Sequence, residues 1–125
     1  LGDVYKDRVV LVRDPIDGTI NYFTGLPTWG VSIGRLRDGV PHVGAVYLPV
    51  TDEMFQAEAG QGALLNGCLL RIDPQGRLHN SSLWALNSDA LQSLRANVPG
   101  VLRNLGSAAA HACYVASRAV TAAAM

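Results

Sequence analysis

The sequence predicts a mixed α/β fold, a layered sandwich of sheet and helices, and the order of its segments carries that prediction. The first half contains strand-like apolar runs joined by short turns, which is typical of an antiparallel meander. The second half alternates strand-like runs with helix-forming segments, which indicates helices packed on a sheet. No linker interrupts the 125 residues, so we expect one domain rather than two.

The first predicted strand spans residues 8–13, a β-branched apolar run between two arginines that is typical of a buried strand. Asp14-Pro15 is expected to end this strand, because proline cannot donate a hydrogen bond to a sheet ladder. A short helical turn should follow, with Asp17 as its cap and the amides of Gly18 and Thr19 in its first turn.

Turn and capping signals place the later elements. Asp38-Gly39 is a strong hairpin signal, and Gly60-Gln61-Gly62 is expected to end a strand. Ser88-Asp89 is expected to cap a helix that Pro99-Gly100 stops, and Ser107 to cap an alanine-rich one. The predicted elements are strands over residues 28–36, 40–48, 54–59, 69–72 and 83–86, a loop over 73–76, a helix over 90–96, a short apolar run over 101–105, a helix over 108–118 and a strand from residue 119.

Composition excludes several classes of protein. Ten acidic and ten basic side chains cancel to a net charge of zero, which argues against a disordered polyelectrolyte and against nucleic-acid binding. No apolar stretch approaches the roughly 18–20 residues of a membrane span. Cys68 and Cys113 lie far apart without zinc-knuckle spacing, so we expect two small buried thiols in a cytoplasmic protein.

Carboxylates are concentrated at the front of the chain, and none follows Asp89. Any binding of a hard metal ion must therefore use residues of the first half. His42, His79 and His111 have no partner at ligand or triad spacing, so we interpret them as structural or solvated.

The tract from Asp14 to Thr19 carries the strongest chemical signal. Asp14 and Asp17 lie three residues apart around a proline bend, and two converging carboxylates repel unless a cation such as Mg²⁺ lies between them. Gly18 and Thr19 follow at a helix start, where backbone amides favour an anion such as phosphate. Metal and phosphate sites would then be adjacent, as metal-assisted phosphoester hydrolysis requires. Read in isolation, such a tract is more often a plain turn.

Several motifs in order resemble the inositol monophosphatase family, the Mg²⁺-dependent, lithium-sensitive sugar-phosphate phosphatases related to fructose-1,6-bisphosphatase. Residues 14–22 resemble that family's signature D-P-[IL]-D-G-T-x-N-[FY]. Later matches are residues 29–34, 44–49 and 53–67, and Arg103 with Gly106-Ser107-Ala108-Ala109, which resembles the family's motif R-x-x-G-[ST]-A-A. The resemblance covers residues 9 to about 118.

The resemblance implies roles for these residues in a family site with two or three Mg²⁺ ions. Asp17 and Thr19 would be catalytic, and water activated by the metal ions would attack phosphorus without a covalent intermediate. The implied metal ligands are Asp14, Asp17 and the backbone carbonyl of Ile16. The implied substrate-binding residues are Ile16, Asp17, Gly18, Thr19, Gly106, Ser107 and Ala108.

The family pattern also has parts that these 125 residues lack. A metal-binding Glu in a G-E-E motif is expected before Leu1, and a metal-binding Asp in a W-D-x-A-[AG]-G motif after Met125. The family's substrate-contacting Glu, expected near the C-terminus, has no acidic counterpart here. We therefore expect residues 1–125 to be the central part of a longer domain, with little or no phosphatase activity alone and with exposed apolar surface that favours self-association.

The predicted function is hydrolysis of inositol monophosphate or a similar polyol phosphate by a cytoplasmic protein that is a homodimer in its full-length form, without nucleic-acid or membrane partners. One alternative is a related phosphatase acting on fructose bisphosphate, a nucleotide 3′-phosphate or histidinol phosphate. Another is a non-catalytic remnant that binds phosphate or a partner protein. The sequence leaves both alternatives open.

Overall fold

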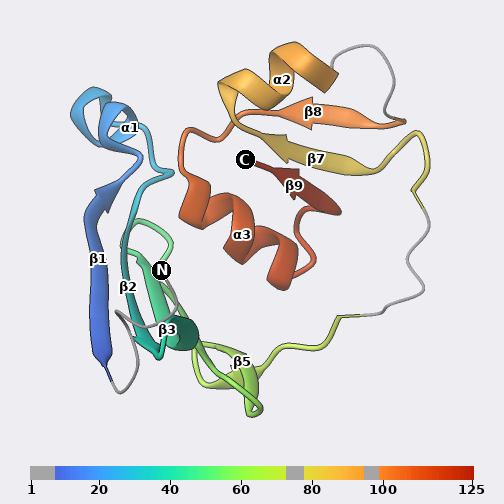
Figure 1. Cartoon of the computed structure of the whole chain (residues 1–125). Helices are drawn as coiled ribbons and strands as arrows, with labels where there is room; N and C mark the ends of the chain where they lie inside the picture. Colours follow the sequence, from blue (N-terminus) through green and yellow to red (C-terminus); the bar gives the residue numbers. More distant parts are fainter. Residues whose placement is uncertain (1–7, 73–77, 95–98) are drawn as a thin grey trace.

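The computed structural model describes residues 8–72, 78–94 and 99–125, and it places their strands in two sheets (Figure 1). The larger sheet is an antiparallel meander in which every strand pairs with the next one along the chain. Its strands are β1 (Val9–Asp17), β2 (Gly30–Arg37), β3 (Val40–Leu48), β4 (Glu53–Glu58), β5 (Gly62–Leu65) and β6 (Cys68–Leu69). The meander predicted for the first half is therefore present.

The second sheet is parallel, with β7 (Leu83–Leu86) between β8 (Val101–Arg103) and β9 (Ala122–Ala124). Its strands alternate with helices, as predicted. The helices are α1 (Thr19–Thr24), α2 (Ser88–Leu94) and α3 (Ala108–Ala116). Over the described ranges, no helix has the length and hydropathy needed to cross a membrane.

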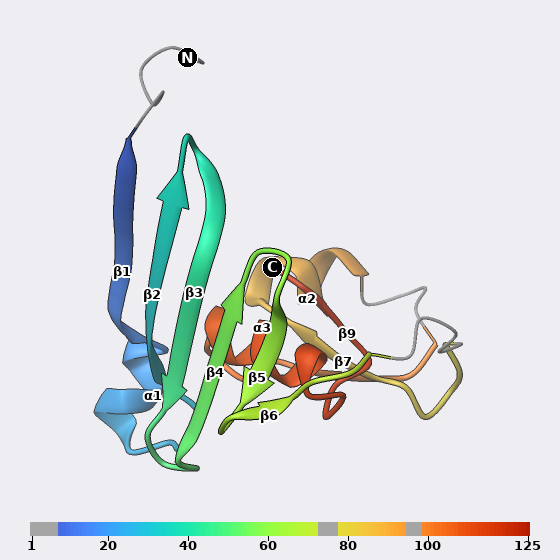
Figure 2. The same cartoon turned by 90° about the horizontal axis from the view of Figure 1, so that it is seen from below.

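Helix α3 lies between the two sheets in both views of the chain (Figures 1 and 2). Leu48 and Phe55 of the meander form a buried cluster with Ala110 and Cys113 of α3. The small side chains of α3 let the helix approach the sheet closely, because they occupy little volume between the backbones. This packing makes the layered α/β arrangement that the segment order predicts.

Strand β1 differs from its prediction in both length and burial. It continues past Asp14-Pro15 to Asp17, with a register irregularity between Asp14 and Asp17. A proline is tolerated there because an irregularity or a strand edge omits the ladder hydrogen bond that proline cannot make. The predicted burial is wrong: Val9 and Leu11 are 61% and 67% exposed, and among the described residues only β2 pairs with β1.

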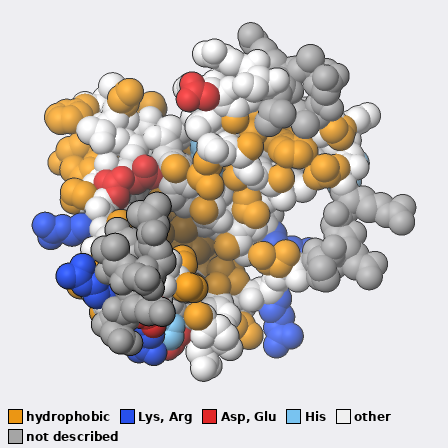
Figure 3. All heavy atoms as spheres, viewed as in Figure 1, with side chains coloured by type: hydrophobic (Ala, Val, Ile, Leu, Met, Phe, Trp, Pro, Cys, Tyr) orange, Lys and Arg blue, Asp and Glu red, His pale blue; other side chains and the backbone are white. Residues whose placement is uncertain are grey.

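Hydrophobic side chains are exposed on other elements as well. In the space-filling view they gather over α1 and over the face formed by α3 and the second sheet (Figure 3). On α1, Ile20 and Phe23 are 78% and 80% exposed. Such surface is consistent with self-association, which stays a prediction.

Other elements also differ from their predictions. Strand β6 ends at Leu69 rather than at residue 72, β8 ends at Arg103 rather than at residue 105, and β9 begins at Ala122 rather than at residue 119. Strand β5 was not predicted: Gly60-Gln61-Gly62 forms a tight turn that returns the chain to pair with β4. Helix α2 begins at Ser88, two residues before the predicted start at Ala90, because the Asn87 side chain accepts a hydrogen bond from the Ala90 amide at 2.8 Å and so caps the helix there. The predicted loop 73–76 and the predicted end of the helix at residue 96 lie outside the described residues.

The two cysteines occupy different environments. Cys113 is buried as predicted, but Cys68 is exposed because it begins β6 at the end of the meander. Burial raises the pKa of the Cys113 thiol to about 12, with a smaller contribution from Glu53. At pH 8 we therefore expect iodoacetamide to modify Cys68 in the folded protein and to leave Cys113 intact, as read by peptide mass spectrometry. Rapid modification of both thiols would contradict the packing of α3.

Candidate functional site

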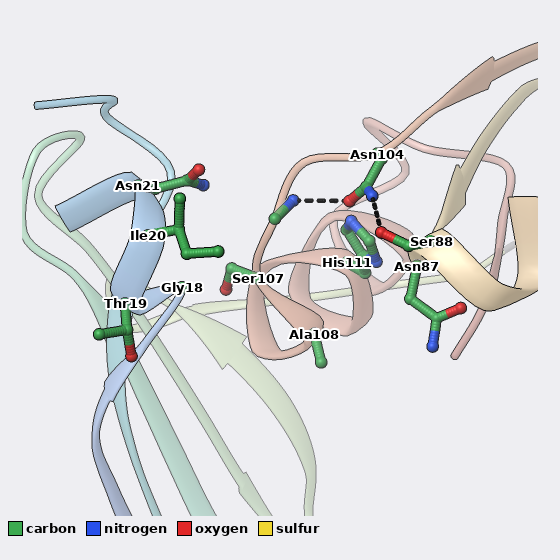
Figure 4. A pocket seen from close by; sticks show the side chains of 11 residues that line it. Gly18, Thr19, Ile20, Asn21, Asn87, Ser88, Asn104, Ser107, Ala108 and His111 are labelled. Atoms are coloured by element: carbon green, nitrogen blue, oxygen red, sulfur yellow. Dashed lines mark hydrogen bonds between the residues drawn. The ribbon is translucent and has the colours of Figure 1, made fainter. Parts of the chain in front are cut away.

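A cavity of about 620 Å³ lies where the start of α1 faces the start of α3, with α2 along its other side (Figure 4). Its wall contains residues from segments that are far apart in the sequence. The lining residues are Gly18, Thr19, Ile20, Asn21, Asn87, Ser88, Asn104, Gly106, Ser107, Ala108 and His111. The cavity therefore brings together Gly18-Thr19 and Gly106-Ser107-Ala108, two motifs that the sequence singles out separately.

Gly18 connects β1 to α1 in a left-handed conformation, with φ +84°. A Cβ atom at this position would lie 2.9 Å from the Thr28 carbonyl oxygen and 3.2 Å from the Gly106 carbonyl oxygen. Only glycine fits such a close approach of three backbone segments. Gly18 is also the residue that caps α1, without a side-chain hydrogen bond, so the predicted capping role of Asp17 is wrong.

Asp17 instead binds the start of α3. Its Oδ2 atom accepts hydrogen bonds from the Ser107 hydroxyl at 2.5 Å and from the Ala109 amide at 2.7 Å. A carboxylate at this position is stabilised because the first amides of a helix have no partner within the helix and carry partial positive charge. Sequence reasoning assigned the Asp17 carboxylate to the adjacent helix α1. It binds α3 instead, more than 90 residues further along the chain.

Ser107 caps α3, as the sequence predicts. Its backbone is extended, with φ −140°, and its Oγ atom accepts a hydrogen bond from the Ala110 amide at 3.1 Å. The same hydroxyl donates to Asp17, so one buried side chain connects the helix with the end of β1. Helix α3 begins at Ala108 as predicted but ends at Ala116, two residues earlier than the predicted end.

Replacing Ser107 by alanine should lower the free energy of unfolding by about 1–2 kcal/mol, because the cap of α3 and one hydrogen bond to Asp17 are both lost. Urea unfolding of the variant would measure the change. Ser93→Ala is the matched control, since the Ser93 hydroxyl donates only to a carbonyl oxygen of its own helix, at exposed positions. Equal destabilisation by both substitutions would disprove the role of Ser107.

Asp14 and Thr19 flank Asp17 and have local partners. Asp14 is exposed and accepts a hydrogen bond from the Ile16 amide at 3.1 Å, while the Thr19 hydroxyl donates to the Ile16 carbonyl oxygen at 3.0 Å. In a regular strand, side chains three residues apart point to opposite faces. The irregularity in β1 removes that alternation between Asp14 and Asp17, so both carboxylates can serve one face.

The donor atoms at this end of β1 are all oxygens: two carboxylates, the Ile16 carbonyl and the Thr19 hydroxyl. Hard oxygen donors of this kind suit Mg²⁺. Within the part of the chain that the structure describes, both hydrogen bonds to Asp17 end on Oδ2, which leaves Oδ1 for another partner. No group of three or more His, Cys, Asp or Glu side chains lies close enough together in residues 8–72, 78–94 and 99–125 to hold an ion. The residues fit a metal ion that takes only part of its ligands from these segments.

Asn21 holds the two halves of the site together, although sequence reasoning assigned no role to it beyond its place in the signature motif. Its Nδ2 atom donates to the Thr28 carbonyl oxygen at 2.5 Å and to the Leu105 carbonyl oxygen at 2.7 Å. The residue is buried, with 8% of its surface exposed. Gly106, with φ +75°, packs directly on this amide: a Cβ atom there would lie 2.7 Å from Asn21 Nδ2.

Sequence reasoning also missed the polar residues on the far side of the cavity. Asn104 accepts a hydrogen bond from the Gly106 amide at 2.9 Å and donates to the Ser88 hydroxyl at 3.1 Å (Figure 4). His111 is 1% exposed and accepts a hydrogen bond from the Leu105 amide at 3.0 Å through Nε2. No spacing rule finds these residues, because folding alone brings them to one cavity.

Comparison with known proteins gives a consistent result. Residues 2–124 match the model of the inositol monophosphatase family. The chain is 37% identical over 119 residues to a Nus factor SuhB of Haemophilus influenzae, which covers 87% of this chain and 45% of that protein. It is 35% identical over 121 residues to an inositol-1-monophosphatase of Mesorhizobium japonicum, which covers 85% of this chain and 44% of that protein.

Solved structures show the same fold. The crystal structure of inositol monophosphatase-II from Staphylococcus aureus superposes with a TM-score of 0.81 at 28% identity, over 97% of this chain and 49% of that one. An inositol monophosphatase from Thermotoga maritima gives a TM-score of 0.75 at 30% identity, over 87% of this chain and 44% of that one. The chain thus spans less than half the length of the relatives compared.

Proposed function

Because the chain belongs to the inositol monophosphatase family, a family of metal-dependent phosphatases, we propose that it contributes one half of a site that hydrolyses a phosphate monoester of a polyol. The observation that carries this proposal is the cavity that Gly18-Thr19 and Gly106-Ser107-Ala108 line together. Phosphate would bind at the first pair, and the alcohol portion of the substrate at the second group. Inositol monophosphate is the substrate that we propose within this class.

The proposed metal ligands are the carboxylates of Asp14 and Asp17 and the carbonyl of Ile16. When bound, Mg²⁺ would supply Lewis-acid stabilisation of the charge on the phosphoryl oxygens. Asp17 is the more constrained carboxylate, because Ser107 and Ala109 fix the position of Oδ2. A carboxylate that is already oriented loses little conformational entropy when it takes a further partner.

Thr19 is proposed to orient the attacking water. Its hydroxyl hydrogen is used in the hydrogen bond to the Ile16 carbonyl, so its oxygen remains an acceptor for a water proton. A water held in this way would attack phosphorus in line with the ester oxygen, and the bond from phosphorus to that oxygen would break. The attacking water loses one proton, and the departing alkoxide takes up one proton to leave as the alcohol, so the step balances. Positioning of this kind is the main contribution that protein side chains make to phosphoryl transfer.

Binding of Mg²⁺ and inorganic phosphate, measured by isothermal titration calorimetry, tests the proposed site. Asp14→Asn and Asp17→Asn should each weaken Mg²⁺-dependent phosphate binding at least tenfold, since each removes a charged oxygen ligand. Asp14→Asn is the cleaner variant, because among the described residues the Asp14 side chain makes only a local hydrogen bond, whereas Asp17 also holds α3. Glu58→Gln is the matched control, since it removes an exposed carboxylate on β4, outside the cavity.

Unchanged binding in both Asp variants, or no binding by the unmodified chain, would favour the non-catalytic remnant. We also expect these residues alone to release phosphate very slowly, because two carboxylates hold Mg²⁺ weakly. Metal-dependent turnover at normal enzymatic rates would refute that expectation. The cytoplasmic setting and the homodimer of the full-length protein stay predictions.

A further inference from the structure

His111 is a buried polar residue that the proposed mechanism does not use. It lies in α3, otherwise built of small and apolar side chains around this position, and only 1% of its surface is exposed. Its ring lines the cavity on the same side as Asn104 and Ser88, across from Thr19 and Ile20 (Figure 4). A buried histidine in such a helix requires an explanation, since an alanine or leucine would cost less to bury.

The hydrogen bonds of the ring define its protonation. Leu105 N–H donates to Nε2 at 3.0 Å, so Nε2 carries a lone pair and the ring proton of the neutral form is on Nδ1. A doubly protonated ring would place two N–H donors face to face. Burial lowers the pKa of His111 and so favours the neutral form, although the charge of Asp17, which binds the start of the same helix, acts in the opposite direction.

Nδ1 is buried without a hydrogen-bond partner among the described residues. An unsatisfied buried donor costs about 1–3 kcal/mol, which a leucine of similar size does not incur. Packing in the core therefore does not explain a histidine at this position. What histidine provides and leucine does not is the hydrogen bond through Nε2.

That contact completes a set of three around the turn that precedes α3. His111 binds the Leu105 amide, Asn21 binds the Leu105 carbonyl, and Asn104 binds the Gly106 amide. The turn leads directly into Gly106-Ser107-Ala108, the part of the cavity proposed for the alcohol portion of the substrate. Because the backbone amide and carbonyl of Leu105 are both held, the orientation of the cavity wall formed by Gly106-Ser107-Ala108 is held as well.

We propose that His111 is a positioning residue for the alcohol side of the cavity, acting through its Nε2 hydrogen bond to the Leu105 amide. The ligand part of this inference rests on the proposed function. The binding affinity for a polyol phosphate would depend on His111, because the hydroxyl groups of the polyol would contact the wall that His111 positions. The affinity for inorganic phosphate, bound at Gly18-Thr19, would not depend on it.

Two variants separate positioning from simple packing. His111→Gln keeps an acceptor close to the place of Nε2, and His111→Leu removes it while filling the space and removing the unsatisfied donor. We expect His111→Leu to be about as stable as the unmodified chain, because it removes the unsatisfied Nδ1 donor but leaves the Leu105 amide without its acceptor. The Leu105 amide hydrogen should exchange at least tenfold faster. His111→Gln should restore slow exchange. Fast exchange in both variants, or slow exchange in both, would overturn the proposal.

Ligand binding provides the second readout, with myo-inositol 1-phosphate and inorganic phosphate as probes in the presence of Mg²⁺. His111→Leu should lose about tenfold in affinity for the ester and keep its affinity for inorganic phosphate, as one positioning hydrogen bond implies. Equal losses for both probes would overturn the inference. If the unmodified chain binds neither probe, the proposed function and the ligand part fail, while the exchange experiment still decides whether His111 holds the turn.

Discussion

Replacing Gly106 by alanine is expected to lower the free energy of unfolding by about 3 kcal/mol or more, the sum of backbone strain and overpacking. The residue has φ +75°, a conformation that costs an alanine about 1–2 kcal/mol. Its new Cβ would also lie 2.7 Å and 2.8 Å from the amide nitrogen and oxygen of Asn21. That amide cannot move aside without breaking its hydrogen bonds to Thr28 and Leu105.

Gly39→Ala separates the two contributions, because Gly39 has φ +78° and a Cβ there would meet nothing within 4 Å. We expect this control to show the backbone strain alone, about 1–2 kcal/mol by urea unfolding. A second test combines Gly106→Ala with Asn21→Ala, which removes the overlapping amide. The double variant should be less destabilised than the sum of the two single variants. Equal losses of unfolding free energy in Gly106→Ala and Gly39→Ala would show that the Asn21 side chain moves away without cost, and would contradict the overpacking.

Asn21→Asp should be the second most damaging substitution, although it changes a single NH₂ group into an oxygen. At pH 7 we expect a loss of about 3 kcal/mol or more, because a buried carboxylate would face two carbonyl oxygens with no donor between them. Asn87→Asp is the matched control. The Asn87 side chain acts as an acceptor at the start of α2, a role that aspartate fills equally well, so its effect should stay within about 0.5 kcal/mol.

The loss of unfolding free energy caused by Asn21→Asp should also increase with pH. Repulsion from the carbonyl oxygens would raise the pKa of the new carboxyl in the folded protein above its unfolded value of about 3.9. The part of the penalty that comes from charge is therefore absent below about pH 4 and grows as the pH rises from there to the folded pKa. Unfolding curves at pH 4 and pH 7 should show a smaller difference from the unmodified protein at pH 4. A difference independent of pH would contradict the buried position of Asn21.

Local signals in the sequence were sufficient for several elements of the fold. The hairpin at Asp38-Gly39 forms where predicted, with both residues at positive φ, because such a turn depends mainly on the conformations that these two residues tolerate. The cap at Ser107 is equally local, since its acceptor and donor lie three residues apart. The strand that begins at Gly62 was missed because pairing with β4, rather than its own short sequence, creates it.

The partner of Asp17 shows where local reasoning stops. The sequence indicated that this carboxylate matters and that a helix start would lie near it, yet the helix that it caps is α3 and not α1. The left-handed Gly18 stands between Asp17 and α1, and folding brings the free amides of a distant helix to the carboxylate instead. Both helix starts satisfied the same local rule, so only the three-dimensional arrangement distinguished them.

The sequence by itself determined the family, the meander followed by alternating strands and helices, and the two short motifs that carry the proposed chemistry. Each of these depends on residue types within a few positions of one another. Tertiary structure alone decided that Gly18 lies too near the Gly106 carbonyl for a side chain, and that Asp17 joins β1 to α3. It also decided that Asn21 binds the carbonyl of Leu105 while His111 binds its amide. These contacts join residues far apart in the chain, and their geometry is fixed by the packing of α3 between two sheets.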